Sequence, residues 1–151
     1  MEMNSWFETT VAIDQMQDDG TTKSVNLKYL VDAFTFTEAE DRIIEEVKPF
    51  TRGNLEVKAV KRVRIAEIFP NDRDECYKWY RVKSVFIMID EKTQAEKETP
   101  FVAMVQSSSV AQSICDFEKG MEGSPVDFRI IAVTETKIED VFEYKAKPAA
   151  N

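Results

Sequence analysis

The residues best suited to binding chemistry are basic and lie in one stretch of the chain. Between positions 58 and 83 there are eight Lys or Arg and four Asp or Glu, a local net charge of +4, whereas the rest of the chain carries −12. In an extended strand, alternate side chains share a face. This spacing predicts a candidate binding face on two strands, made of Lys58, Arg62, Arg64, Trp79, Arg81 and Lys83.

Such a face has three interpretations. Cations that flank an aromatic ring bind single-stranded nucleic acid through phosphate contacts and base stacking, and they also suit an acidic protein partner. Alternatively, the basic side chains pair with Asp and Glu on neighbouring strands and cover Trp79 with their aliphatic stems. The net charge of −8 disfavours phosphate binding over the whole surface.

The chain contains no histidine, and this excludes several common sites from these residues. Imidazole zinc sites, Ser-His-Asp triads and Cys-His pairs all need that side chain. Cys76 and Cys115 are 39 residues apart and form no C-x-x-C motif, so we expect two free thiols in a reducing compartment. We therefore predict no catalytic residue, no cofactor and no metal ligand, and an enzyme with a Lys or carboxylate site is the third-ranked function.

Two polar segments invite a ligand but have simpler explanations. Residues 14–20 contain three Asp before a Gly, yet Met16 interrupts the oxygen ligands that a calcium loop requires, and Asp-Gly is typical of a hairpin turn. Residues 107–109 are three Ser at an expected helix start, where capping explains hydroxyl groups without a bound anion.

The elements that would position these residues occur twice. Residues 6–69 and 79–142, 64 residues each, both begin with Trp and a second aromatic residue and continue as two extended runs separated by a polar break. Each then has a capping-box pattern, Thr37–Glu40 and Ser109–Gln112, that predicts a helix start. A long segment with alternating apolar residues follows and predicts a return strand.

The apolar stripe of each predicted helix indicates what it buries. In the first copy the stripe is Ala39, Ile43 and Val47, at spacings of four. In the second it contains Ala111 and Cys115, followed by Phe117 or Lys119. We therefore expect Cys115 to replace Ile43 as a small buried residue rather than a reactive thiol.

These patterns predict an α+β protein built as a tandem ββαβ duplication, with about six largely antiparallel strands and two helices on one face. We predict a single duplicated domain over residues 1–144, with repeat one at 6–69, a polar bridge at 70–76, repeat two at 79–142 and a flexible tail at 145–151. Because the copies would share packing, we expect that neither half is stable alone.

The first copy also resembles a known family. Trp6-Phe7, residues 29–33, residues 36–40 and residues 43–47 are similar to a family of short proteins of unknown function from gut Bacteroidetes and their phages. The resemblance implies a cytoplasmic, non-secreted protein and assigns no activity and no site residues.

We expect a non-enzymatic accessory or regulatory binding module that acts through protein–protein interaction in the cytoplasm. The partner would be another protein or a second copy, because a homodimer could cover an apolar sheet face. Single-stranded nucleic acid is the alternative partner. No membrane partner is expected, since the longest apolar run, Val85–Ile89, is far shorter than the roughly 20 residues of a membrane span.

Overall fold

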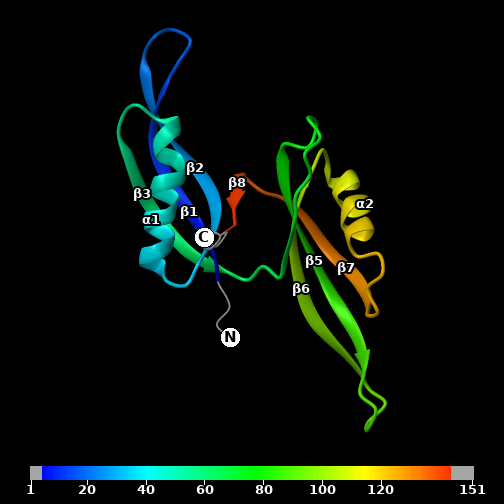
Figure 1. Ribbon diagram of the computed structural model, residues 1–151. Helices are drawn as coiled ribbons and strands as arrows, with labels where there is room; N and C mark the ends of the chain where they lie inside the picture. Colours follow the sequence, from blue (N-terminus) through cyan, green and yellow to red (C-terminus); the bar gives the residue numbers. More distant parts are fainter. Residues whose placement is uncertain (1–4, 144–151) are drawn as a thin grey trace, which may run out of the picture. The chain divides into compact units, whose positions relative to one another are not determined.

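The computed structural model describes residues 5–143 and has a mixed α+β fold. The described residues form two compact units, unit 1 from residues 5–64 and 138–143 and unit 2 from residues 65–137. In unit 1 the elements are β1 (Ser5–Met16), β2 (Thr22–Ala33), α1 (Phe36–Val47), a 3₁₀ turn (Lys48–Phe50), β3 (Leu55–Val63) and β8 (Ile138–Phe142). In unit 2 they are β4 (Glu67–Phe69), β5 (Lys78–Ile89), β6 (Glu96–Ser107), α2 (Val110–Gly120) and β7 (Asp127–Glu135) (Figure 1).

Each unit contains one four-stranded sheet and one helix. The strand orders are β3-β1-β2-β8 and β4-β6-β5-β7. Within each sheet two strand pairs are antiparallel, and the pairs β2–β8 and β4–β6 are parallel. The expected α+β class is confirmed. Within residues 5–143 the structure has eight strands in two sheets, each sheet with its own helix, whereas the sequence predicted about six strands with both helices on one face.

The last strand of each sequence half lies in the other unit. β4 follows β3 in sequence but pairs with β6 of unit 2, and β8 follows β7 but pairs with β2 of unit 1. Both additions use the same pattern of an acid, a β-branched residue and Phe. Residues 67–69 lie opposite Ala103, Met104 and Val105, and residues 140–142 lie opposite Tyr29, Leu30 and Val31.

The core of unit 1 forms where α1 covers one face of its sheet. Ala39, Ile43 and Val47 are buried against apolar residues of β1 and β2, as the stripe predicted. The helix begins two residues earlier than expected, because the N-cap is Thr35 and not Thr37. The Thr35 hydroxyl accepts a hydrogen bond from the Glu38 N–H at 3.1 Å.

Unit 2 is built in the same way, but the prediction for its helix stripe was wrong. The Ser109 cap is confirmed, since its hydroxyl accepts from the Gln112 N–H at 3.0 Å. α2 buries Ser113 and Phe117, and Cys115 is exposed. The sequence alignment of the two copies matched Ser109 with Thr37, whereas the structure shows that Ser109 corresponds to Thr35, the N-cap of α1. With the N-caps aligned, the residue that corresponds to Ile43 is Phe117 and not Cys115.

The acidic segment in the first hairpin is a turn, as predicted. The Gly20 N–H donates to the Gln17 carbonyl at 3.0 Å, and Gly20 has a φ of 86°, which favours glycine. Asp19 accepts hydrogen bonds from both the N–H and the hydroxyl of Thr21. Within residues 5–143 no group of three or more Cys, Asp or Glu could hold a metal ion.

Two expectations concern the ends and the membrane. The tail at 145–151 lies outside the described residues. In the part of the chain that is described, no helix is long and apolar enough to cross a bilayer.

Candidate functional site

The six residues of the predicted binding face are divided between the units. Lys58, Arg62 and Arg64 belong to unit 1, whereas the other three belong to unit 2. In β3 the pairing shifts by one residue, since Thr10 lies opposite Ala59 and Val11 lies opposite Val57. This bulge leaves Lys58 outside the ladder, so simple alternation does not assign Lys58, Arg62 and Arg64 to one face.

Two of the three predicted residues of unit 1, Lys58 and Arg62, have structural contacts. The Lys58 ammonium lies 3.2 Å from the Glu56 carboxylate. The Arg62 guanidinium lies 5.5 Å from the centre of the Phe7 ring and 5.6 Å from that of Phe36, within the range of a cation–π contact. Arg64 follows the end of β3 and is exposed.

In unit 2 the alternation holds, but the aromatic residue is inaccessible. β5 pairs regularly from Lys78 to Lys83, so Trp79, Arg81 and Lys83 share a face. Trp79 is only 3% exposed, and its Nε1–H has no hydrogen-bond partner within residues 5–143. A ring buried to this extent is not available for stacking on a base.

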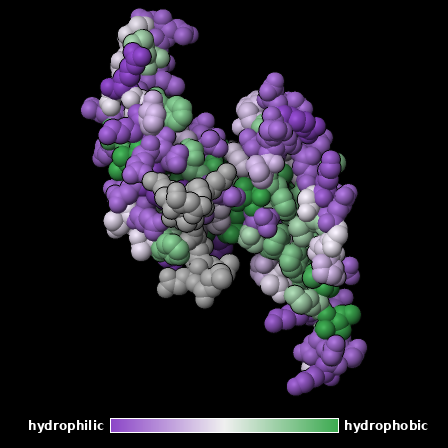
Figure 2. Space-filling view, in the orientation of Figure 1, coloured by the Kyte–Doolittle hydropathy of each residue, from purple (hydrophilic) through white to green (hydrophobic). Residues whose placement is uncertain are grey.

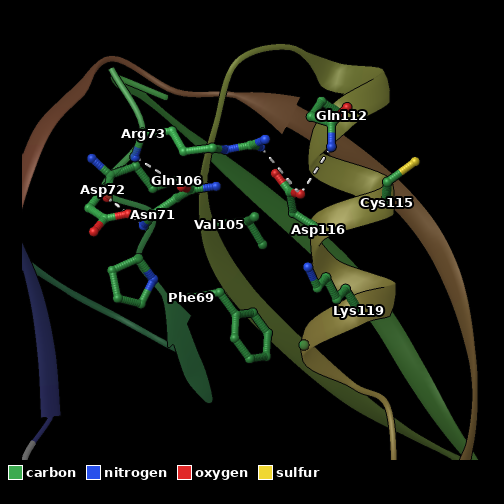
Figure 3. A pocket seen from close by; sticks show the side chains of 12 residues that line it. Phe69, Asn71, Asp72, Arg73, Val105, Gln106, Gln112, Cys115, Asp116 and Lys119 are labelled. Atoms are coloured by element: carbon green, nitrogen blue, oxygen red, sulfur yellow. Dashed lines mark hydrogen bonds and ion pairs between the residues drawn. The ribbon is translucent and has the colours of Figure 1, made fainter. Parts of the chain in front are cut away.

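A cleft of about 560 Å³ lies elsewhere in unit 2, where the bridge segment, residues 70–76, faces α2 (Figure 3). One wall is the end of β4 with the bridge segment, and the other is the exposed side of α2. The end of β6 closes the bottom. We refer to this concave site as the unit 2 cleft.

The floor of the unit 2 cleft is apolar. Phe69 and Val105 lie opposite each other in the β4–β6 pair, and the Phe69 ring packs edge-on against Phe117 with ring centres 6.0 Å apart. Gly120 allows α2 to end close to this ring, because a Cβ at that position would lie 2.9 Å from a Phe69 ring carbon. A larger residue at 120 would displace the ring that forms the floor.

Asp116 is the acid on the α2 wall, and its carboxylate is already well satisfied. Oδ2 accepts a hydrogen bond from the Ser107 hydroxyl at 2.7 Å, and Oδ1 accepts from the Gln112 amide at 3.1 Å. The Arg73 guanidinium is 4.0 Å away, at the limit of an ion pair. The Asp116 side chain is 17% exposed, so these donors replace most of the hydrogen bonds that its carboxylate would make with water.

Two cations reach the cleft from opposite walls. The Arg73 side chain is 51% exposed, and one of its nitrogens donates to the Cys76 sulfur at 3.7 Å. This hydrogen bond, with smaller effects from Glu75 and Asp116, raises the pKa of Arg73, so the group is always charged. Lys119 extends from α2 into the cleft, whereas the Cys115 sulfur points away from it (Figure 3).

The bridge segment is held against β6 by hydrogen bonds. The Asn71 N–H donates to the Gln106 side-chain oxygen at 2.9 Å, and the Asn71 side-chain oxygen accepts from the Arg73 N–H at 3.1 Å. The position of Arg73 is therefore fixed at its backbone while its long side chain remains exposed.

Sequence reasoning placed none of these residues in a site. Residues 70–76 were predicted to be a linker, and Ser107 was predicted to be part of a helix start. One feature of the sequence could have indicated the site. Gln112 and Asp116 are four residues apart, so they lie on the same side of the predicted helix. Only the parallel addition of β4 brings the bridge segment opposite that side.

The comparisons identify a family and no relative of known function. None of the curated proteins compared with the chain matches it. The family described as Domain of unknown function (DUF4494) matches residues 5–144. Because this match covers nearly the whole chain, the protein belongs to the DUF4494 family.

Proposed function

We propose that the protein is a non-enzymatic accessory or regulatory binding module that acts through protein–protein interaction, with the unit 2 cleft as its recognition site. One observation carries this proposal. The cleft combines the partly exposed Phe69 ring, which lies opposite the fully buried Val105, with the cation of Lys119, which has no ion-pair partner within residues 5–143. Concave sites with an apolar base and a few polar groups are typical of ligand recognition.

The state of the acid in the cleft favours binding over catalysis. A general base must be directed at its substrate within hydrogen-bond reach. The Asp116 carboxylate is 17% exposed and is held in place by hydrogen bonds from Ser107 and Gln112, so it serves the wall of the cleft more readily than it reaches a ligand. The bond from Ser107 holds the α2 wall to the end of β6, and the bond from Gln112 fixes the carboxylate within α2.

Exposed apolar side chains elsewhere also suit a protein partner. Met88 and Ile89 at the end of β5 are 45% and 64% exposed, and Met16 at the end of β1 is 76% exposed. Figure 2 shows apolar side chains beside the hydrophilic tip of the β5–β6 hairpin. The partner can be a second copy of the chain, a case that light scattering over a concentration series tests directly.

Selection from a library of displayed random peptides tests the proposal. Peptides enriched on the full chain should be lost on the double variant Arg73→Met with Lys119→Met, because both cations are exposed and their removal leaves the core intact. Lys92→Met is the matched control, since Lys92 is exposed in the same unit and does not line the cleft. Enrichment that is equal on the double variant would refute the cleft as the recognition site.

The second candidate is a protein that binds single-stranded nucleic acid. The observation in its favour is the half-exposed Phe36 ring, 49% accessible, with the Arg62 cation beside it, whereas the burial of Trp79 speaks against it. Quenching of intrinsic fluorescence by oligothymidylate, with a steep loss at higher salt, would support this function. Arg62→Met should then abolish the quenching.

We also propose that the two units arose by duplication. Three geometric correspondences support it. Trp6 and Trp79 are each the second residue of the first strand of a long hairpin, β1–β2 and β5–β6, and the bulge after Thr10 corresponds to the bulge after Lys83. The parallel additions of β8 and β4 share one register. The free thiols support the further proposal of a cytoplasmic location.

A further inference from the structure

We infer that the unit 2 cleft binds a single carboxylate group that neighbours an apolar side chain, and hence an acidic segment of a peptide. This inference rests on the proposed function and names the chemistry of its partner. Arg73 and Lys119 would hold the carboxylate, and the Phe69 floor would accept the apolar group.

The first step concerns the freedom of Arg73. Its distance of 4.0 Å from Asp116 and 3.7 Å from Glu75 exceeds that of a direct hydrogen bond. The guanidinium is half-exposed, and a turn toward an incoming carboxylate gives up its weak hydrogen bond to the Cys76 sulfur without removing the group from a buried position. A planar fork of N–H donors matches the two oxygens of a carboxylate.

The second step concerns the sign and size of the ligand charge. Four charged side chains line the cleft, Arg73, Lys119, Asp72 and Asp116, and their formal charges cancel. Figure 3 shows Asp72 at the side of the cleft away from Lys119 and Asp116. The centre of the cleft therefore offers two cations, opposed by the hydrogen-bonded Asp116 and by the exposed Glu75 that lies 3.7 Å from Arg73. This balance suits one negative charge better than the near-double charge of a phosphate group.

The third step is that Asp116 competes with the ligand. Its carboxylate is the nearest acid to Arg73 on the α2 wall and repels an incoming anion. Asp116→Asn removes that charge and keeps an oxygen that can accept from Ser107. We therefore expect this variant to bind an acidic ligand more tightly, whereas loss of either cation weakens binding. A purely structural role for Asp116 predicts the opposite sign.

The experiment is a titration of the isotope-labelled full chain with acetyl-Glu-Phe-amide, followed by NMR shifts of the Arg73 and Lys119 side chains. Arg73→Met and Lys119→Met should each weaken binding about fivefold, as for an exposed ion pair. Asp116→Asn should strengthen it about two- to fivefold, and Lys92→Met should leave it unchanged. Acetyl-Gln-Phe-amide and inorganic phosphate should bind more weakly than the acidic peptide.

The outcomes separate this inference from the proposed function. Equal binding of the Gln peptide, tighter binding of phosphate, or weaker binding by a folded Asp116→Asn variant would overturn the carboxylate assignment. If displayed peptides without acids are still lost on the Arg73 and Lys119 double variant, the ligand class is wrong and the recognition site stands. If no peptide depends on these two residues, both proposals fall.

Discussion

The exchange of end strands predicts that a substitution near the C-terminus destabilises the N-terminal sheet. Phe142 lies in β8, opposite Val31 of β2, and its ring stacks on Tyr29 with centres 5.7 Å apart. Phe142 packs against the core of unit 1, although most of the second half of the sequence belongs to unit 2. Phe142→Ala should therefore loosen β2 and leave β6 largely unaffected.

The magnitude follows from the burial of the ring. Replacing a fully buried Phe by Ala costs about 3–5 kcal/mol. Phe142 is only half-buried, so we expect about 2 kcal/mol, including the loss of its contact with Tyr29. Since each 1.4 kcal/mol is a factor of ten, the amides of residues 28–31 should exchange roughly 30-fold faster.

Hydrogen exchange followed by mass spectrometry measures this effect, and Phe69→Ala is the matched control. Phe69 occupies the same position in β4, opposite Val105, and packs on Phe117 in unit 2. Its substitution should accelerate exchange in β6 and spare β2. Comparing the two variants cancels any shared loss of global stability. The strand exchange would be refuted if Phe142→Ala acted mainly on β6 or Phe69→Ala mainly on β2.

Three further predictions concern caps, thiols and pH. Thr35→Ala should lower the free energy of unfolding by about 1 kcal/mol, while Thr37→Ala should change it by less than about 0.5, in denaturant titrations. One equivalent of maleimide should label Cys115 in the native protein, and Cys76 should react only after denaturation. Burial of Tyr80, and secondly the charge of Glu135, raises the pKa of this residue above its usual value near 10. The contribution of Tyr80 to the free energy of unfolding is therefore complete below pH 10 and is lost as the pH rises through the raised pKa. Tyr80→Phe should flatten that decline in alkaline melting curves.

Local chemistry made much of the fold predictable. The hairpin turn at residues 17–20, the Ser109 cap and the stripe of Ile43 and Val47 depend on residues only a few positions apart, and each was confirmed, although Asp18 and Asp19, rather than Asp19 and Gly20, are the central residues of the turn. The α1 cap was misplaced because Thr35 and Thr37 both match the preference for a hydroxyl before the first turn. That error of two residues alone moved Cys115 into the core in place of Phe117.

The strand exchange could not be predicted from local patterns. A short apolar strand such as Glu67–Phe69 carries no information on which sheet edge it joins, because the β2 and β6 edges accept the same pattern. The bulge at Lys58 also could not be predicted from local patterns. One extra residue in a strand changes which side chains lie on the same face, and this altered the predicted binding face. The burial of Trp79 is likewise a tertiary property.

The unit 2 cleft exists because corresponding positions of the two units carry different side chains. Asp32 and Gln106 lie opposite Trp6 and Trp79, and the helix residues before Ile43 and Phe117 are Arg42 and Asp116. In unit 1 the Arg42 guanidinium lies 2.6 Å from the Asp32 carboxylate, so strand and helix are joined directly.

In unit 2 no such pair is possible, because the strand residue is the neutral amide Gln106. Asp116 turns to Ser107 and Gln112 instead, and Gln106 holds the bridge segment that carries Arg73. In unit 1 the positive charge beside the acid comes from Arg42. In unit 2 it comes from the exposed Arg73, whose guanidinium lies 4.0 Å from the Asp116 carboxylate. A loose pair of this kind adds little to stability, and an incoming carboxylate can replace its acid at low cost.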